Sequence, residues 1–184
     1  MTMWTVTSRS PDETTAWGRR TGLLCRGGET IFLQGDLGAG KTRFAQGLAD
    51  GLGIPASVPV TSPTFTLHAE YAGRLRFQHL DLYRLETPTE ALGLGFDELL
   101  GRGDGVAAVE WPECLSPEER PGLRISIAHG GEDASDTVRC LTWVADDARH
   151  AALLEALRRL WTFTSALGEG LKRHKPTKDA SNTL

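Results

Sequence analysis

Cysteine is scarce in this chain and never closely spaced. The three cysteines, Cys25, Cys114 and Cys140, are an odd number and form no C-x-x-C pair, which argues against a disulfide framework and against a zinc site. A reducing cytoplasm fits this usage best. The first residues, MTMWTVTSRSPDE, lack a basic region followed by an apolar run, and no stretch approaches the roughly 18 apolar residues of a membrane span. We therefore expect a soluble, cytoplasmic protein with no membrane partner.

The chain also lacks an excess of positive charge. Its 20 Lys and Arg residues are outnumbered by 24 Asp and Glu residues, which gives a net charge of −4. Proteins that grip nucleic acid through its phosphates usually carry a broad basic face. If RNA is involved in the function, we expect partner proteins to hold it. The 184 residues are enough for one α/β domain with a full core.

What the chain does have is a glycine-rich phosphate-binding motif. Residues 35–42 (GDLGAGKT) fit the pattern G-x-x-x-x-G-K-[ST], in which a loop of glycines cradles phosphates on backbone N–H groups. Lys41 is then expected to reach the β- and γ-phosphate oxygens, and the Thr42 hydroxyl is expected to bind Mg²⁺. An ordinary glycine-rich turn would explain the glycines but not the order Lys41-Thr42.

The sequence around this loop supplies the strand and the helix that such a motif requires. Residues 30–34 (TIFLQ) are apolar and β-branched, as expected of a buried strand. After the loop, Phe44, Leu48 and Leu52 recur on one helical face together with two alanines, and Gly51 and Gly53 end the helix. The pattern predicts a strand, a phosphate loop and a helix in direct succession.

The rest of the chain predicts an α/β fold, a three-layer fold of the P-loop NTPase type with a mixed central sheet. The short turn between the strands at 65–71 and 75–83 makes that pair antiparallel. Further elements are an edge strand at 3–7, a helix at 11–25, a buried strand at 106–109, a hairpin of 124–128 with 137–144, and a helix from 146 to about 167. Short helical patches are expected at 89–92 and 96–100. We expect one P-loop ATPase domain at 1–167 and a disordered tail at 168–184.

Two acidic residues are placed to complete a phosphate site. Glu110 follows four apolar residues, at the carboxyl edge of a buried strand, where a second Mg²⁺ ligand is usually found beside the P-loop strand. Asp81 ends a strand directed toward the same edge and is a candidate to position the attacking water or a metal-bound water. The alternatives are that Glu110 is a solvated rim residue and that Asp81 only pairs with Arg84. Thr64, in a Ser-Pro-Thr turn, is placed like a loop that senses the γ-phosphate.

Other residue types narrow the use of the phosphate. The only asparagine is Asn182, so the N-K-x-D motif that reads guanine in Ras-type GTPases is missing. A small metabolite kinase would need an arginine-containing lid, for which Arg102, Glu118, Glu119 and Arg120 are sparse candidates. His68, His79, His129 and His150 show no metal-ligand spacing and receive no role. An ATPase whose hydrolysis resets a complex is favoured, and the kinase remains the second reading.

Four linked motifs resemble those of the TsaE family, in order and in spacing. They are residues 35–42 (GDLGAGKT), 61–67 (TSPTFTL), 79–85 (HLDLYRL) and 109–113 (VEWPE), within a match over roughly residues 10–145. The resemblance implies the bacterial ATPase of tRNA threonylcarbamoyladenosine synthesis, which works with TsaB and TsaD on the adenosine 3′ of the anticodon in tRNAs that decode ANN codons. TsaD would carry out the transfer, and this chain would hydrolyse ATP.

The same resemblance implies roles for single residues. ATP and Mg²⁺ are the expected cofactors, with Mg²⁺ on Thr42 and Glu110. Lys41, Asp81, Glu110 and Thr64 are expected to take part in hydrolysis, Thr64 as part of the sensing loop. Trp111 is expected near the nucleotide or a partner, although a core position is equally open. The expected nucleotide cradle is Asp36, Leu37, Gly38, Ala39, Gly40, Lys41 and Thr42, with Trp111 beside it.

Overall fold

A single twisted sheet forms the centre of the computed structural model, which describes residues 2–172 except 94, 96–99, 101–102, 116–120 and 132–133. Its seven strands follow the order β1-β7-β6-β2-β5-β4-β3. In chain order they are β1 (Thr2–Ser8), β2 (Glu29–Gln34), β3 (His68–Tyr71), β4 (Arg76–Asp81), β5 (Gly105–Glu110), β6 (Leu123–His129) and β7 (Arg139–Ala145). The helical elements are α1 (Pro11–Leu24), α2 (Lys41–Gly51), α3 (Pro88–Gly93), the short 3₁₀ turn η1 (Pro112–Cys114) and α5 (Ala148–Lys172).

The sheet is mixed, as the sequence predicts. The central strand β2 pairs parallel with β5 and β6, and β5 pairs parallel with β4. The two expected hairpins, β3–β4 and β6–β7, are antiparallel, and β1 adds an antiparallel edge strand to β7. Strand β5 is buried along its whole length, which is why its sequence is an uninterrupted apolar run up to Glu110. This arrangement confirms the expected α/β fold.

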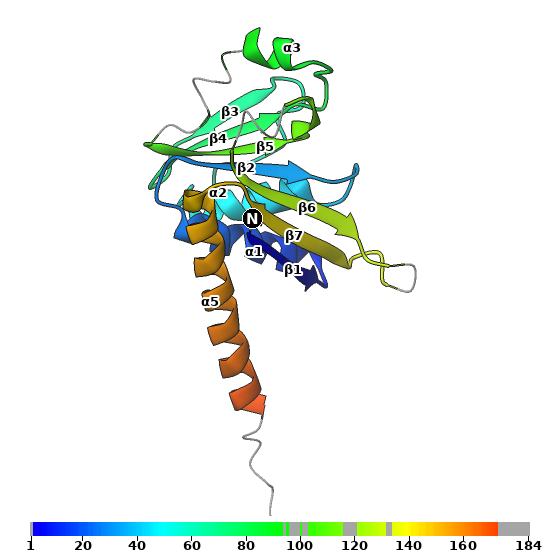
Figure 1. The fold of residues 1–184 in the computed structure, drawn as a ribbon, viewed down its shortest axis with the longest axis vertical. Coiled ribbons are helices and arrows are strands. Elements are labelled where there is room, and N and C mark those ends of the chain that lie inside the picture. Colours follow the sequence, from blue (N-terminus) through cyan, green and yellow to red (C-terminus); the bar gives the residue numbers. More distant parts are fainter. Residues whose placement is uncertain are drawn as a thin grey trace, which may run out of the picture.

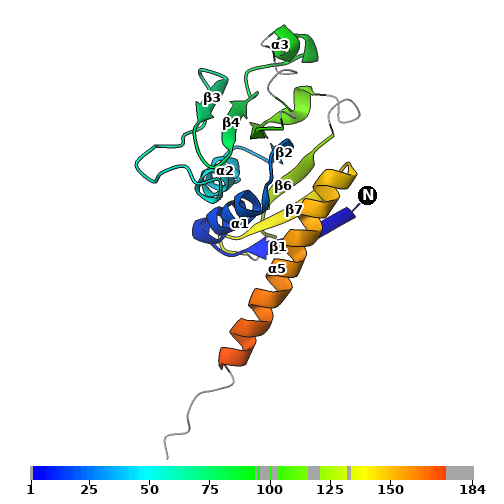
Figure 2. The ribbon, with the colours of Figure 1, turned by 90° about the vertical axis from the view of Figure 1, so that its left-hand side faces the viewer.

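Helices cover both faces of the sheet to different extents (Figures 1 and 2). On one face, α1, α2 and α5 bury the larger core, which includes Phe44, Leu48 and Leu154. The other face carries a smaller core in which Ala91 of α3 and Leu115, just after η1, pack on β4 and β5. The P-loop strand β2 contributes side chains to both cores and so lies at the middle of a three-layer fold.

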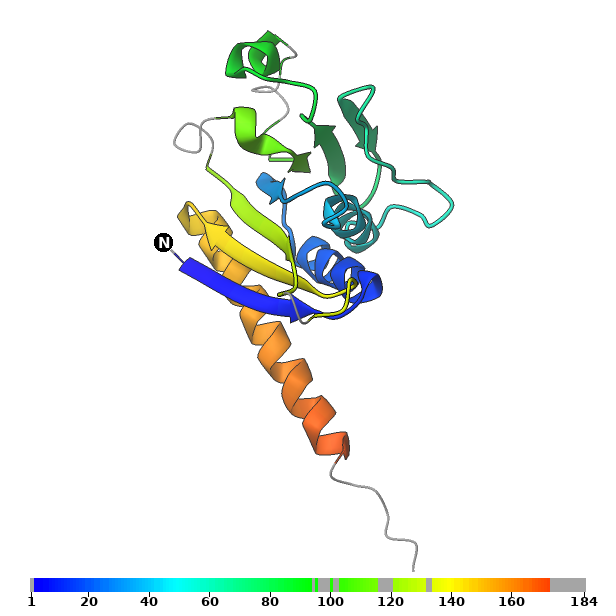
Figure 3. The same cartoon turned by 90° about the vertical axis from the view of Figure 1, so that its right-hand side faces the viewer.

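Four of the five tryptophans form a ring cluster that packs the terminal elements β1 and α5 against α1 and β7. Trp4 of β1 stacks on Trp143 of β7 at 5.3 Å between ring centroids, and Trp17 of α1 meets both rings edge-on. Trp161 of α5 lies 4.8 Å from Trp17, so the last helix is tied to the first. Beyond this contact α5 projects away from the sheet (Figure 3). In the part of the chain that the structure describes, no helix is both long and apolar enough to span a bilayer.

Two boundaries differ clearly from the sequence-based expectation. Strand β3 begins at His68 and not at residue 65, because Leu67 has a φ of 63° and closes a turn in which its N–H donates to the Pro63 carbonyl. Phe65, expected in this strand, is 87% exposed. Helix α5 continues to Lys172, past the expected end near residue 167, because two interspersed glycines weaken a helix by only about 1 kcal/mol each. Residues 96–99 of the expected patch at 96–100, and 173–184 of the expected tail, lie outside the described residues.

Helices α1 and α2 approach each other closely because glycines of each helix face the backbone of the other. A Cβ at Gly47 of α2 would lie 1.9 Å from the Thr15 carbonyl oxygen, and a Cβ at Gly18 of α1 would lie 2.1 Å from the Phe44 carbonyl oxygen. Glycine inside a helix normally costs about 0.5–1 kcal/mol relative to alanine. Here the glycines allow the two helix backbones to pack in direct contact. This contact fixes the position of α2 relative to α1 and so positions the phosphate loop at the start of α2.

Replacing Gly47 by alanine should therefore destabilise the fold, although alanine is the better helix former. We expect Gly47→Ala to lower the free energy of unfolding by about 1–3 kcal/mol, because the two helices must separate to admit the methyl group. Equilibrium urea denaturation measures this. Gly131→Ala is the matched control, since nothing lies within 4 Å of its added Cβ, and it should change stability by less than about 0.5 kcal/mol. Equal stability of both variants would refute the close-packing argument.

Candidate functional site

The loop between β2 and α2 leaves the first N–H groups of the helix free to bind a ligand. Gly40, at the N-cap of α2, has a φ of 111° and offers no side chain to cap these groups. Gly35, at the end of β2, has a φ of 141°, and a Cβ there would lie 2.2 Å from the Ile127 carbonyl oxygen of β6. The glycines thus let the loop turn tightly over the sheet. Uncapped N–H groups at a helix N-terminus are a favourable site for an anion.

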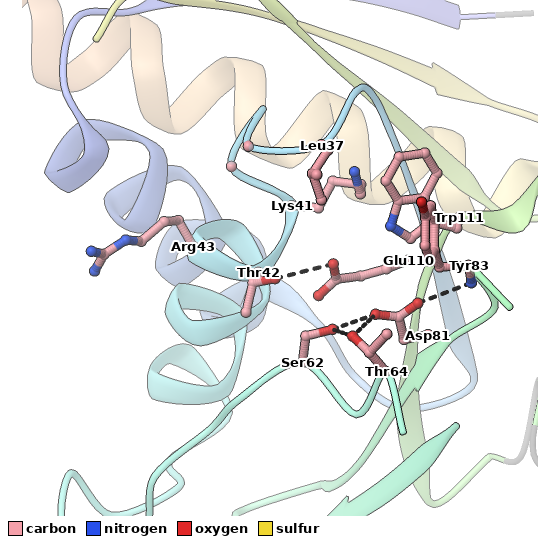
Figure 4. A pocket seen from close by; sticks show the side chains of 12 residues that line it. Leu37, Lys41, Thr42, Arg43, Ser62, Thr64, Asp81, Tyr83, Glu110 and Trp111 are labelled. Atoms are coloured by element: carbon pink, nitrogen blue, oxygen red, sulfur yellow. Dashed lines mark hydrogen bonds between the residues drawn. The ribbon is translucent and has the colours of Figure 1, made fainter. Parts of the chain in front are cut away.

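Lys41 projects into the space enclosed by this loop (Figure 4). Its ammonium donates hydrogen bonds to the carbonyl oxygens of Gly35 and Asp36 and lies 3.5 Å from the centre of the Trp111 ring. Burial lowers the pKa of the ammonium, whereas the nearby charges of Glu110 and Glu113 act in the opposite direction. The cation is therefore held by the loop itself, next to the uncapped end of α2.

The two expected magnesium ligands lie in contact. Pairing of Leu33 with Glu110 across β2 and β5 brings the end of β5 beside the phosphate loop. There the Thr42 hydroxyl donates to Glu110 Oε2 at 3.1 Å. Glu110 is only 2% exposed, which excludes the alternative of a solvated rim residue. The position expected for Glu110, beside the phosphate loop, is confirmed, and the binding of Mg²⁺ stays a prediction.

Asp81 lies directly opposite Glu110 in the parallel pairing of β4 with β5. Its Oδ2 accepts hydrogen bonds from the Thr64 hydroxyl at 2.7 Å and from the Ser62 hydroxyl. Its Oδ1 accepts from the Tyr83 N–H at 3.0 Å. Asp81 is thus the anchor of the loop that carries Thr64. Among the described contacts Asp81 makes no ion pair with Arg84, whose guanidinium instead lies over the Phe65 ring.

Trp111 occupies a backbone conformation that is rare for a large residue. Its φ and ψ are 57° and 56°, in the left-handed region, and its N–H donates to the Leu33 carbonyl at 3.2 Å. Its ring tilts against the Tyr83 ring at 4.9 Å and faces the Lys41 ammonium (Figure 4). Trp111 therefore lines the site and is not part of either core. Such strain of about 1–3 kcal/mol persists where surrounding contacts hold it, often at functional sites.

These side chains enclose a cavity of about 370 Å³. It brings together most of the residues singled out in the sequence, namely Leu37, Gly38, Gly40, Lys41, Thr42, Thr64, Asp81, Glu110 and Trp111. Asp36 and Ala39 do not line it: the Asp36 carbonyl accepts a hydrogen bond from Lys41, and Ala39 is buried. Four motifs that are far apart in the sequence thus converge on one hollow.

Several residues of the site were missed by sequence reasoning. Ser62 and Tyr83 line the cavity, and His79 donates from Nε2 to Glu110 at 2.9 Å. Arg139 of β7 donates to the Ala39 carbonyl at 3.0 Å and so ties the phosphate loop to the far half of the sheet. The spacing of His79, two residues before Asp81 on one strand, was a usable signal. No sequence pattern links Arg139 to Ala39, which is 100 positions away.

A second cavity, of about 150 Å³, adjoins the other side of the phosphate loop. It shares Gly38, Gly40 and Arg43 with the first cavity and is closed by Thr14 of α1 and Arg139 of β7. The loop is therefore flanked by space on both sides.

The oxygen donors present fit a divalent cation that arrives with a nucleotide. Glu110 and Thr42 supply a carboxylate and a hydroxyl, which are hard ligands suited to Mg²⁺. No group of three or more His, Cys, Asp or Glu side chains that could hold an ion by itself occurs in the described ranges. Mg²⁺ commonly takes only one or two protein ligands and completes its shell with phosphate oxygens and water. Two protein oxygens beside a phosphate loop are consistent with this coordination preference.

A glycine-rich loop between β2 and α2, in a mixed sheet flanked by helices, defines an α/β protein with a P-loop NTPase-like fold. A solved structure of the same architecture is that of Bacillus subtilis YdiB, with a TM-score of 0.70 and 35% sequence identity over 86% of this chain and 95% of that one.

The family follows from the sequence comparisons. Residues 8–138 match the family model described as threonylcarbamoyl adenosine biosynthesis protein TsaE. The tRNA threonylcarbamoyladenosine biosynthesis protein TsaE of Bacillus subtilis is 42% identical over 154 residues, covering 82% of this chain and 90% of that protein. The protein of the same name from Treponema pallidum is 46% identical over 121 residues, covering 66% and 87%. The chain belongs to the TsaE family, which confirms the resemblance that the four motifs carry.

The anchoring role of Asp81 can be tested without a ligand. We expect Asp81→Ala to speed amide hydrogen exchange in residues 61–67 at least about fivefold, because a lost hydrogen bond is worth about 1 kcal/mol. Hydrogen exchange followed by mass spectrometry measures this. Glu70→Ala, on the same hairpin, removes an acceptor for Gln78 and should leave residues 61–67 unchanged. Unaltered protection in the Asp81 variant would show that residues 61–67 keep their conformation without the hydrogen bonds to Asp81.

Proposed function

We propose that this chain is a Mg²⁺-dependent ATPase required for threonylcarbamoyladenosine modification of tRNA, acting in the cytoplasm. It works with the TsaB and TsaD proteins, and its hydrolysis of ATP resets their complex, which alone contacts the tRNA. The observation that carries the proposal is the convergence of Lys41, Thr42 and Glu110 on one cavity at the uncapped N-terminus of α2. Family membership supports the pathway, since the relatives carry it in their names.

Each side chain has a role that follows from its contacts. The free N–H groups of the loop and of α2 bind the phosphates, and the Lys41 ammonium leaves its two carbonyl partners to meet the β- and γ-phosphate oxygens. Thr42 and Glu110 would hold Mg²⁺, which would neutralise phosphate charge. Asp81 holds Thr64 at the edge of the cavity, where the loop senses the γ-phosphate. Asp81 itself positions the attacking water or a metal-bound water.

The described lining of the cavity favours transfer to water over transfer to a metabolite. A kinase needs further cations to clamp a second substrate. Of the arginines, only Arg43 lines this cavity in the described part of the chain, and its side chain points away from the carboxylates (Figure 4). The lid residues considered from sequence, Arg102 and 118–120, lie outside the described residues. Beside the two carboxylates, the described lining offers the hydroxyls of Ser62 and Thr64 and no arginine that faces them.

Removal of the loop lysine tests the phosphate site. Lys41→Ala should lower the rate of phosphate release from ATP by about 10²–10³-fold, because it deletes the cation that faces the developing charge. The measurement is steady-state release of inorganic phosphate by the purified chain. Arg19→Ala deletes an exposed cation that pairs with Asp50 on the helix surface and should hydrolyse ATP normally. Normal turnover by the Lys41 variant would remove this cavity as the site.

Metal dependence is tested at Glu110. Glu110→Gln should raise the Mg²⁺ concentration needed for half-maximal ATP turnover at least about tenfold, because the amide is a much poorer ligand than the carboxylate. ADP binding in EDTA, measured by calorimetry, should be nearly unchanged. Glu113→Gln provides the control, since Glu113 adds charge near Lys41 without lining the cavity. Equal losses with and without metal would make Glu110 a structural residue.

The partner proposal needs a test of its own. Wild-type chain with TsaB, TsaD and ATP should support many rounds of tRNA modification per complex, and Lys41→Ala should stop after about one round, because the complex is no longer reset. Modified tRNA and released phosphate are measured together over time. If ATP is consumed only when a small hydroxyl compound is added, and ADP forms without free phosphate, the chain is a kinase.

A further inference from the structure

One buried contact of the site has no role in the proposed function. His79 of β4 is fully buried, and its Nε2 lies 2.9 Å from Glu110 Oε1. A carboxylate is an acceptor only, so Nε2 carries the proton and donates. The other ring nitrogen, Nδ1, has no partner among the described residues. The contact with Glu110 is therefore the single polar interaction that the described structure assigns to this imidazole.

Strand register places the imidazole beneath the carboxylate. His79 pairs with Ala108, and Asp81 pairs with Glu110, so all four side chains project from the same face of β4 and β5. Ala108, the small partner of His79 on β5, is also fully buried. The imidazole ring is stacked on Phe77 at 5.6 Å. Packing thus fixes the ring before any ligand binds.

As a consequence, the two carboxylate oxygens of Glu110 have different partners. Oε1 accepts the His79 N–H, while Oε2 faces Thr42 at 3.1 Å. An oxygen that accepts a buried hydrogen bond loses that bond if it turns toward a cation, which is costly in a desolvated site. Oε2, which accepts the Thr42 hydrogen bond, is then the oxygen positioned to share a cation with the Thr42 hydroxyl.

We propose that His79 is a positioning residue that restricts Glu110 to one cation-facing oxygen and thereby makes the site prefer Mg²⁺ over Ca²⁺. The inference rests on the proposed function, because it concerns the cation that accompanies the nucleotide. Mg²⁺ requires near-octahedral coordination and takes carboxylates through single oxygens, whereas Ca²⁺ accepts six to eight ligands and readily takes both oxygens of a carboxylate. A carboxylate with one oxygen withheld suits the smaller ion.

Two conservative variants separate this role from simple packing. In His79→Gln the amide nitrogen can occupy the place of Nε2 and donate to Glu110, whereas in His79→Asn the shorter amide takes the place of Nδ1 and cannot reach it. Calorimetry of ADP binding is carried out with Mg²⁺, with Ca²⁺ and in EDTA, together with the thermal midpoint of each variant. The readout is the concentration of each cation that gives half of the maximal gain in ADP affinity.

We expect His79→Gln to stay within about threefold of the wild type for both cations. His79→Asn should raise the half-maximal Mg²⁺ concentration by about 10–100-fold, as is usual when a partner of a metal ligand is lost. The Ca²⁺ requirement should change several-fold less, so that the preference for Mg²⁺ falls. Affinity for ADP in EDTA should not change.

A matched buried histidine controls for loss of stability. His150 of α5 is 3% exposed and accepts the Thr30 N–H through Nε2, away from the cavity. His150→Asn should lower the thermal midpoint without altering the Mg²⁺ preference. Equal behaviour of the two His79 variants, or a parallel shift for Mg²⁺ and Ca²⁺, would overturn the inference while leaving the ATPase proposal intact. A wild-type chain that binds ADP no better with Mg²⁺ than in EDTA would overturn both.

Discussion

Parallel pairing of three neighbouring strands is the constraint on which the site depends. Because β2, β5 and β4 run in the same direction, their carboxyl ends meet at one edge, and the phosphate loop, Glu110 and Asp81 emerge there together. Each pairing fixes which face a side chain occupies, and a slip of one residue would turn Glu110 to the opposite face. The polar site is thus positioned by backbone hydrogen bonds that are buried and far less adaptable than the side chains themselves.

The loop above this edge is held from two further directions. On the helix side, the glycine contacts between α1 and α2 fix the position of the N-terminus of α2 relative to the strands. From the side, Arg139 of β7 binds the loop carbonyls of Gly38 and Ala39. The antiparallel half of the sheet, which contributes no carboxylate to the main cavity, therefore supports the site indirectly. A loop restrained in this way can present N–H groups without first paying to order them.

Sequence patterns correctly predicted those features that depend on residues close together in the chain. The phosphate loop, its strand and helix, both hairpins and the positions of Glu110 and Asp81 all follow from short-range periodicity and from one motif. Arg139 could not be assigned because packing across the sheet brings it to Ala39. The spacing of His79 from Asp81 was a signal, but only the strand register identifies Glu110 as its partner. Phe65 was misplaced for a related reason: its apolar surroundings look like a strand, but the backbone at Leu67 turns left-handed and delays β3. Local preference was overruled there by the contact of the turn with Asp81.

The left-handed backbone at Trp111 has a consequence for which amino acids this position can tolerate. Glycine or asparagine would adopt this conformation with less strain. For tryptophan, the contacts of the ring must therefore offset the free energy of the strained backbone. The ring touches Tyr83 and the Lys41 ammonium and neither core, so its value lies in the cavity and not in folding. Under the proposed function, position 111 is therefore one at which a substitution by glycine or asparagine would relieve backbone strain and also remove a ring from the cavity, a trade-off between stability and activity.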